Sequence, residues 1–291
     1  MSKVMIVGCG DLGGAVASQL AQFDIHVIGV RRSATQLAGV SVIQADVTAP
    51  TTLHQLNEIQ PEILIYCVAA NGQTDEQYQA AYVDGLRNVL ATQAKNSALQ
   101  HVFFVSSTRV YGQETDVLLD ETVEALPADF GGARLLEAEN LLKNIPCKST
   151  ILRLSGIYGA GRLRMINLAA ALKTFPENWP AQNGWTNRIH RDDAAAFMVF
   201  LVKKVLASQA LSHCYIVTDS KPVSQYEVLT WIARQLNNQL SAEISPIKGG
   251  KRLSNQAMLS TGFTLQYPDY QAGYQALLTD YFATKTTSPH V

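Results

Sequence analysis

The chain has 291 residues, of which 47% are hydrophobic and 16% are charged, so it can bury one large core or two unequal ones. Its 23 basic and 24 acidic residues leave a formal net charge of -1, which gives no electrostatic support for binding nucleic acids or anionic membranes. The longest apolar runs begin at Ile63 and Ala194 and are far shorter than the ~20 residues that cross a bilayer. The N-terminus lacks the pattern of an export signal, so we expect a cytoplasmic protein without a membrane partner.

Four cysteines stand singly within apolar segments, at Cys9, Cys67, Cys147 and Cys214. This spacing matches neither a disulfide framework nor the paired cysteines of a metal site. We therefore predict four buried free thiols and no bound metal.

Short β-branched runs alternate with stretches of helical period through the first half of the chain. Strands are predicted over residues 4–8, 26–30, 40–46, 63–69, 101–107 and 149–155. A first helix is predicted over 12–21, and Thr74 with Gln77 predicts a capping box at the start of a long one. Continuously apolar strands are typical of a parallel sheet covered on both faces, so the predicted fold class is α/β, with a doubly wound Rossmann-type sheet.

The regular alternation ends near Ser155, and helices and irregular segments predominate from Ser220 onward. We predict a dinucleotide-binding domain made of residues 1–155 and 186–218. A smaller, interleaved substrate-binding domain is predicted over 156–185 and 219–283, followed by a solvated tail over 284–291.

The first predicted strand runs directly into GCGDLGG, where Gly8, Gly10 and Gly13 stand at GxGxxG spacing before a helix. Glycines at these positions allow a tight turn, close approach of backbone amides to a pyrophosphate, and packing of the helix on the strand. The alternative is an ordinary glycine-rich turn. The residues predicted to hold the phosphates are Gly8, Cys9, Gly10, Asp11, Leu12 and Gly13.

The second strand is followed by Arg31 and Arg32, where an acidic residue would bind the ribose 2′-hydroxyl of NAD. Two adjacent guanidinium groups favour the 2′-phosphate of NADP, although a solvated basic loop is the alternative. Asp46 ends the third strand and is placed either to meet the adenine or to cap the next helix. The predicted cofactor site also includes residues that end or follow the third and fourth strands, namely Val47, Val68, Ala69 and Ala70.

Five motifs occur in order along the chain: GCGDLGG, QAD, VSSTRVYG, RLSGIYGAGR and IHRDDAAAF. This series resembles the extended short-chain dehydrogenases/reductases, the NAD-dependent epimerase/dehydratase family, over roughly residues 3–270. The resemblance implies that the second serine of VSSTRVYG, Ser107, polarises the substrate oxygen beside the nicotinamide. Thr108 and Tyr111 would line the same reacting centre. The alternatives are that Ser107 caps a turn and that Tyr111 packs its ring under the cofactor.

The family usually carries a YxxxK motif on the next helix, in which tyrosine exchanges a proton and lysine holds the ribose. At the matching positions this chain has Phe130 and Arg134. A phenyl ring carries no exchangeable proton, whereas Arg134 can still bind the ribose. His190 could move a proton near pH 7, or could be a structural histidine. Thr108 and Arg109 replace an acidic pair that dehydratases commonly have, which disfavours a sugar dehydratase.

The resemblance also implies a small polar substrate, commonly a nucleotide sugar, for which we predict contacts from Tyr158, Arg162, Arg188 and His190. It implies a homodimer that packs through the helices beginning at Thr74 and Phe130. The predicted function is that of an NAD(P)-dependent oxidoreductase or epimerase-like enzyme. The alternative is a non-catalytic NAD(P)-binding sensor or scaffold protein.

Overall fold

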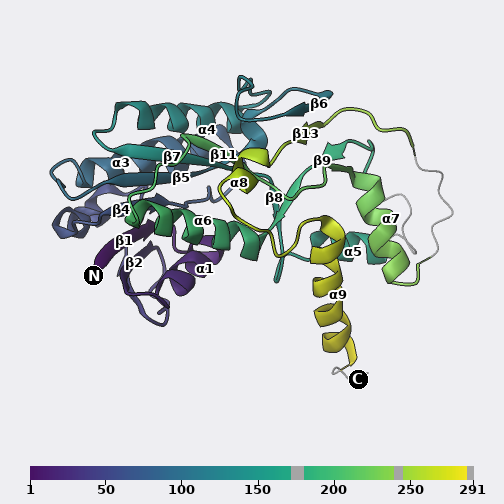
Figure 1. Cartoon of the computed structure of the whole chain (residues 1–291), viewed down its shortest axis with the longest axis horizontal. Helices are drawn as coiled ribbons and strands as arrows, with labels where there is room; N and C mark the ends of the chain where they lie inside the picture. Colours follow the sequence, from purple (N-terminus) through teal and green to yellow (C-terminus); the bar gives the residue numbers. More distant parts are fainter. Residues whose placement is uncertain (172–179, 239–244, 287–291) are drawn as a thin grey trace. The chain divides into compact units, whose positions relative to one another are not determined.

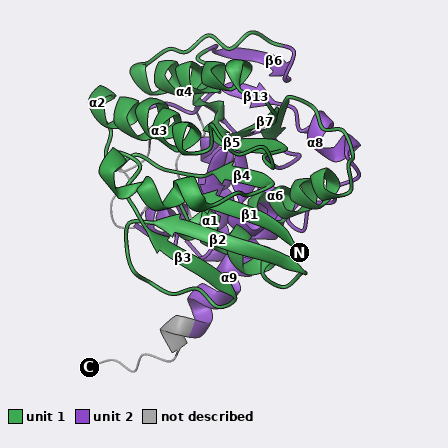
Figure 2. Ribbon diagram, turned by 90° about the vertical axis from the view of Figure 1, so that its left-hand side faces the viewer, with its two compact units in different colours: residues 1–112, 123–154, 194–216 green, residues 113–122, 155–193, 217–291 purple. Residues whose placement is uncertain are grey.

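The computed structural model describes residues 1–171, 180–238 and 245–286, and the chain forms two compact units (Figure 2). Unit 1 contains residues 1–112, 123–154 and 194–216. Unit 2 contains residues 113–122, 155–193 and 217–291. The predicted tail over 284–291 begins inside helix α9 (Tyr270–Thr286), and residues 287–291 lie outside the described part.

A seven-stranded sheet in the order β11-β7-β5-β4-β1-β2-β3 dominates the first half of the chain (Figure 1). Its strands are β1 (Ser2–Val7), β2 (Ile25–Arg31), β3 (Val40–Gln44), β4 (Ile63–Tyr66), β5 (His101–Ser107), β7 (Lys148–Leu154) and β11 (Cys214–Val217). The pairings from β3 across to β7 are parallel. The strand order reverses between β1 and β4, so the sheet has the topological switch point of a Rossmann-type fold, and the predicted fold class is confirmed.

The central strands are apolar on both faces because helices cover both sides of the sheet. Met5, Ile6, Leu64 and Ile65 are fully buried. Helices α1 (Asp11–Leu20) and α6 (Arg191–Leu206) lie on one side, while α3 (Gly85–Thr92) and α4 (Phe130–Leu141) lie on the other (Figure 1). Every loop that leaves the carboxyl end of a parallel strand therefore reaches the same edge of the sheet, where we expect a ligand.

The long helix predicted to begin after Thr74 is interrupted. The capping box is confirmed, since the Gln77 amide donates to Thr74 Oγ1 at 3.3 Å and the Thr74 amide donates to Gln77 Oε1. A π-helix over Gln79–Asp84 separates α2 (Asp75–Tyr78) from α3. The Tyr66 hydroxyl of β4 donates to Ala81 O in this widened turn at 2.5 Å. A hydroxyl inserted into the helix ladder explains the π-helix.

Unit 2 is built from short strands and helices. Its elements are β6 (Thr115–Leu119), β8 (Gly156–Tyr158), α5 (Arg164–Ala171), β9 (Trp185–Thr186), β10 (Arg188–His190), β12 (Val223–Ser224), α7 (Gln225–Gln235), β13 (Lys251–Leu253), α8 (Gln256–Ser260) and α9. The strands pair two by two as β10-β8, β12-β9 and β13-β6. Side chains of α5, α7 and α9 form the core, including Ile166, Leu229 and Leu278. The N-terminal residues of α6 also belong to this unit.

None of the four cysteines, all of which lie in the described part of the chain, forms a disulfide, but only Cys9 is buried. The prediction of burial is wrong for Cys67, Cys147 and Cys214, which are half-buried. Each lies at or beside the end of a strand, where the cover of the flanking helices is incomplete. Among the described helices, none is long and apolar enough to cross a membrane.

Candidate functional site

Glycines shape the turn that follows β1. Gly8 has a φ of +91°, and a side chain there would overlap the carbonyl oxygen of Cys67. The amides of Gly8 and Cys9 donate to Val30 O at 2.9 and 3.0 Å, which anchors the turn to β2. A side chain at Gly13 would overlap the carbonyl oxygen of Gly8, so α1 can lie close to the strand only with glycine at this position. The structure therefore shows two of the three reasons for glycine that the motif implies, the tight turn and the close packing of α1 on the strand.

The N-terminus of α1 opens onto free space at this turn. Gly10 is the N-cap residue, no side chain in the described part of the chain caps the helix through a hydrogen bond, and a Cβ at Gly10 would meet no described atom within 4 Å beyond its chain neighbours. Asp11 is exposed and Leu12 is buried in the first turn. A helix N-terminus that no side chain caps or covers is suited to a phosphate group, so the residues present fit the pyrophosphate of a dinucleotide.

Two arginines stand at the end of β2. Arg31 is its last residue, and the Nε atom of Arg31 is buried without a hydrogen-bond partner among the residues that the structure describes. Arg32 is exposed, and its carbonyl oxygen accepts a hydrogen bond from Gln44 Nε2 at 2.9 Å. A buried guanidinium nitrogen without an acceptor fits a phosphate ligand and costs free energy if it stays unpaired.

The predicted residues after β3 and β4 lie near this turn or on neighbouring strand ends. Asp46 Oδ1 accepts from the amide and the hydroxyl of Thr48 at 2.9 and 2.8 Å, an arrangement that closes a local turn. Val47 is buried. A Cβ at Gly8 would lie 2.7 Å from the amide nitrogen of Val68, so the loop after β4 borders the glycine turn. Of the next two residues, Ala69 is exposed and Ala70 is half-buried.

Ser107 ends β5 and is the N-cap of a short 3-10 helix over Thr108–Val110. Its Oγ accepts from the Arg109 amide at 3.2 Å, so the capping contact predicted as an alternative is present. The hydroxyl hydrogen of Ser107 takes no part in that contact, which leaves Ser107 able to donate to a substrate oxygen. Thr108 is buried, with 8% of its surface exposed.

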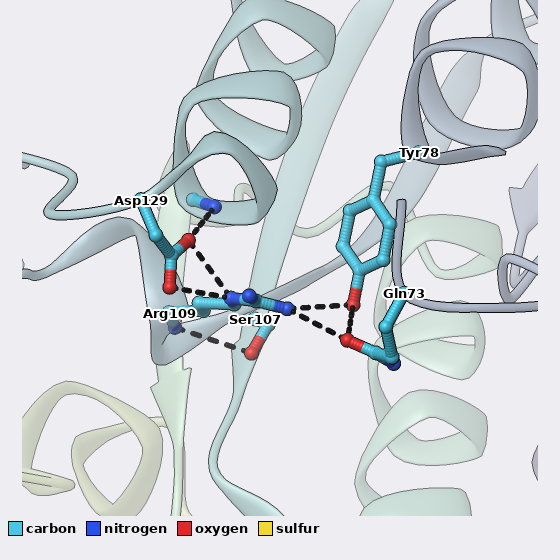
Figure 3. A network of polar contacts seen from close by, with 6 residues as sticks. Gln73, Tyr78, Ser107, Arg109 and Asp129 are labelled. Carbon is cyan, nitrogen blue, oxygen red and sulfur yellow. Dashed lines mark hydrogen bonds and ion pairs between the residues drawn. The ribbon is translucent and has the colours of Figure 1, made fainter. Parts of the chain in front are cut away.

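A polar network surrounds the side chain of Arg109 (Figure 3). Arg109 Nε donates to both carboxylate oxygens of Asp129, at 2.9 and 3.0 Å. Arg109 Nη1 donates to Tyr78 Oη at 2.8 Å and to Gln73 Oε1 at 3.2 Å. The guanidinium also lies over the rings of Tyr78 and Phe130, at 5.1 and 5.3 Å from the ring centres. The cation is thus held in one place from several sides.

Asp129 and Phe130 begin helix α4. Asp129 Oδ1 accepts from the Gly132 amide at 2.8 Å as the N-cap contact, besides its bonds to Arg109. The Phe130 ring packs edge-on against the Tyr78 ring, with the centres 5.5 Å apart. A side chain at Gly131 would lie 2.5 Å from the Arg109 guanidinium carbon, so this glycine makes room for the cation.

Arg134 is bound by two carboxylates. Its Nε and Nη2 donate to the two oxygens of Asp75 at 2.7 and 2.9 Å, and its Nη1 donates to Glu137 at 2.8 Å. The hydrogen bond from Arg134 holds the pKa of Asp75 below its usual value, and Asp75 in turn raises the pKa of Arg134. A ribose contact from Arg134 would therefore use only the N–H groups that point away from these acids.

Tyr111 lies deeper than its neighbours and is fully buried. Arg153 Nη1 donates to its hydroxyl at 2.6 Å, and the Arg153 guanidinium lies 4.9 Å from the Tyr111 ring centre. Arg153 in turn is bound by Glu139, at 3.1 and 2.6 Å, and Glu139 also accepts from Ser106. These contacts hold Tyr111 within a buried polar network of unit 1.

In unit 2, the structure places Tyr158, Arg188 and His190 in one neighbourhood with Asp219. Each is at most 7% exposed, and each has a side-chain atom without a hydrogen-bond partner among the described residues. These atoms are Tyr158 Oη, Arg188 Nη1, His190 Nε2 and Asp219 Oδ2. The Tyr158 and His190 rings meet edge to face with their centres 5.2 Å apart. Arg162, by contrast, is exposed.

Burial dominates the charge state of this cluster. It raises the pKa of Asp219 to about 7, although Arg188 opposes the shift, and it raises the pKa of Tyr158. It also lowers the pKa of His190, whose Nδ1 accepts from the Asp192 amide at 3.2 Å. His190 is therefore neutral near pH 7, with its proton on Nε2.

Sequence reasoning did not name Gln73, Tyr78, Asp129 or Asp219 as site residues. Tyr78 and Tyr82 stand four residues apart just after the capping box, and this pair was the available signal. No sequence signal identifies Asp219, because Arg188 and Asp269, whose charges act on its pKa, lie 31 and 50 positions away in the chain. Among the described residues, no group of three His, Cys, Asp or Glu side chains is placed to hold a metal ion.

The fold and the glycine turn define an α/β protein of the Rossmann type. Residues 2–257 match the family described as the RmlD substrate binding domain. A solved structure from Methylobacillus flagellatus, described as a proposed NAD-dependent epimerase/dehydratase, is 47% identical, with 96% of this chain and 98% of that one covered and a TM-score of 0.86. The chain therefore belongs to the RmlD substrate binding domain family, within the NAD-dependent epimerases/dehydratases.

More distant structures share the fold. A UDP-glucose 4-epimerase is 18% identical, with 94% of this chain and 95% of that one covered and a TM-score of 0.75. A UDP-glucuronic acid 4-epimerase from Bacillus cereus, solved in complex with NAD, is 16% identical, with 93% and 95% covered and a TM-score of 0.73. None of the curated proteins matches the chain.

Proposed function

We propose that the protein is an NAD(P)-dependent enzyme that moves a hydride at a carbonyl or secondary alcohol of a polar small molecule, with a nucleotide sugar as the first substrate class to test. The observation that carries the proposal is the glycine turn, which leaves the N-terminus of α1 open to a pyrophosphate. Membership of the epimerase/dehydratase family supports it, as do fold relatives named for UDP-sugars, one of them solved with NAD.

The residues of unit 1 would have roles in cofactor binding that follow from their positions. Gly8, Gly10 and Gly13 would cradle the pyrophosphate, and Arg31 with Arg32 would bind the 2′-phosphate of NADP, which is the cofactor we expect to be preferred over NAD. The bound nicotinamide would supply or accept the hydride. The remaining cofactor contacts would come from Cys9, Asp11, Leu12, Asp46, Val47, Val68, Ala69, Ala70 and Arg134.

Ser107 would donate a hydrogen bond to the substrate oxygen, with Thr108 next to it. Tyr111 would keep the loop after β5 in place through its bond to Arg153. Tyr158, Arg188 and His190, with the exposed Arg162, would bind the substrate. The unpartnered atoms of the three buried side chains support this assignment, because a buried polar atom gains most from a ligand that completes its hydrogen bonds.

A titration with NADPH and NADH at fixed salt, followed by nicotinamide emission, tests the cofactor assignment. We expect tighter binding of NADPH. Arg31→Ala should remove the preference, while Arg87→Ala, at an exposed surface pair with Asp84, should leave it intact. Equal binding of both nucleotides would contradict the 2′-phosphate assignment. Failure of the folded protein to bind either one would contradict the whole proposal.

Substrate turnover is tested with panels of UDP-sugars, dTDP-sugars and simple carbonyl compounds. The expected result is turnover of at least one compound that Ser107→Ala lowers by about 10²-fold, with nucleotide affinity unchanged. Tight nucleotide binding without turnover of any compound would favour a non-catalytic sensor or scaffold instead.

A further inference from the structure

Reduction of a carbonyl by hydride transfer leaves a negative oxygen that must gain a proton, and the reverse reaction must remove one. Phe130 carries no exchangeable proton, so another side chain near the end of β5 has to supply it. The phenols that follow β4 and β5 in unit 1 are Tyr78, Tyr82 and Tyr111. Tyr111 is fully buried with its hydroxyl bound to Arg153. Burial raises the pKa of Tyr82. Tyr78 is the remaining phenol of the three.

Tyr78 differs from the other two phenols because the arginine that donates to its hydroxyl, Arg109, also donates to Ser107. Arg109 Nη1 donates to Tyr78 Oη at 2.8 Å, and bonds to both oxygens of Asp129 prevent the guanidinium from turning away. A fixed cation at hydrogen-bond distance stabilises negative charge on the phenol oxygen when the proton leaves. Gln73 Oε1, 3.2 Å away, is the acceptor for the Tyr78 hydroxyl hydrogen in this arrangement.

Arg109 also connects Tyr78 to Ser107 (Figure 3). The backbone amide of Arg109 donates to Ser107 Oγ at 3.2 Å, while its side chain donates to Tyr78 Oη. Two hydroxyl groups, one from the end of β5 and one from α2, are therefore held by a single residue. The Phe130 ring packs edge-on against the Tyr78 ring, with the ring centres 5.5 Å apart.

From this geometry we propose that Tyr78 is the proton-transfer residue of the hydride-transfer reaction, with Arg109 as the positioning cation; the inference rests on the proposed function. In the reducing direction, the carbonyl carbon gains a hydride from a reduced nicotinamide dinucleotide and the carbonyl electron pair moves to the oxygen. That oxygen takes the proton of Tyr78 Oη, and the phenolate regains a proton from water. In the oxidising direction, the phenolate accepts the alcohol proton as the hydride leaves for the oxidised dinucleotide.

The first test needs no substrate. The protein is labelled with ¹³C at Cζ of every tyrosine, and the signal that disappears in Tyr78→Phe identifies Tyr78. Addition of NADPH or NAD should shift this signal, and Arg109→Met should shift it in the free protein, while the Tyr281 signal from α9 stays in place. If the nucleotides bind but the Tyr78 signal does not move, the inference fails and the proposed function stands. If no nucleotide binds, both fail.

The second test uses a compound that the substrate panels turn over. Tyr78→Phe should lower kcat by about 10²-fold with little change in KM or in nucleotide affinity. Adding Phe130→Tyr to that variant places a hydroxyl on the adjacent ring and should restore part of kcat. Tyr281→Phe is the matched control and should keep the original kcat. An unchanged kcat in Tyr78→Phe would overturn the proposal, as would a loss in which nucleotide affinity falls equally.

Discussion

One buried polar cluster in unit 1 and one in unit 2 differ in how far their hydrogen bonds are completed. In unit 1, Glu139 is 2% exposed and accepts from Ser106 Oγ at 2.6 Å and from two nitrogens of Arg153 at 3.1 and 2.6 Å. The third nitrogen of Arg153 donates to Tyr111. In unit 2, Arg188 and Asp219 are equally buried, yet each keeps a side-chain atom without a partner in the described part of the chain.

This difference separates a structural network from the cluster that we propose binds the substrate. The paired network fastens α4 to β5 and β7, and α4 carries Asp129 and Phe130 at its N-terminus. Its value is rigidity, because a fully satisfied buried network has one arrangement. Buried polar atoms without a hydrogen-bond partner lower the free energy of unfolding. A protein keeps such atoms where a bound ligand or proton supplies the missing hydrogen bond.

The largest effect is expected from breaking the paired network. Glu139→Ala leaves the Arg153 guanidinium buried without its counterion, so the free energy of unfolding should fall by about 3–5 kcal/mol. Urea unfolding followed by circular dichroism measures this loss. Glu137→Ala on the same helix is the matched control, since this carboxylate is 41% exposed and its pair with Arg134 is expected to contribute less than about 1 kcal/mol. Equal losses in the two variants would show that the buried network is not what stabilises unit 1.

The next effect concerns Asp219 and depends on pH. Its pKa is raised from 3.8 to about 7 in the folded protein, chiefly by burial. Between about pH 4 and 7 the folded chain keeps a proton that the unfolded chain has released, so stability falls as the pH rises through this window and is constant above it. At about 1.4 kcal/mol per pKa unit, the loss is on the order of 4 kcal/mol.

Asp219→Asn should remove this pH dependence of the free energy of unfolding. At pH 8, unit 2 of the variant should be more stable than unit 2 of the original protein. The fluorescence of Trp185 and Trp231, both in unit 2, reports unfolding of the unit that contains Asp219. Asp280 on α9 is exposed, so Asp280→Asn serves as the control. Its free energy of unfolding should change with pH as steeply as that of the original protein. If the free energy of unfolding of Asp219→Asn still falls as the pH rises from 4 to 7, another titrating group causes the pH dependence.

A smaller loss of stability is expected when a helix cap is removed, and the loss should differ between the two units. Asp129 caps α4 and also binds Arg109, whereas Ser224 caps α7 through one hydrogen bond to the Glu227 amide at 3.1 Å. Asp129→Ala should cost about 2 kcal/mol and Ser224→Ala about 1 kcal/mol, as thermal unfolding would measure. The Tyr78 carbon signal should also shift in Asp129→Ala only, because that variant frees the Arg109 guanidinium. Identical behaviour of the two variants would mean that Asp129 acts as a cap alone.

Local chemistry made much of unit 1 predictable from the sequence. Apolar runs bounded by turn residues predicted the strands, the spacing of Gly8, Gly10 and Gly13 predicted the phosphate turn, and Thr74 with Gln77 predicted a capping box. These features depend on residues a few positions apart, whose geometry a sequence pattern records directly. The π-helix after Tyr78 escaped prediction because its cause, the Tyr66 hydroxyl, comes from a separate strand.

By itself, then, the sequence determined the α/β class, the Rossmann-type sheet and its glycine turn, because backbone geometry and hydrophobic period are properties of neighbouring residues. Only the tertiary structure decided which side chains meet at the site. Arg109 reaches Asp129 across 20 positions and Tyr78 across 31, and Asp219 lies near Arg188 across 31. Such contacts depend on how elements pack, and a hydrogen bond or ion pair between distant segments leaves no periodic trace in the chain.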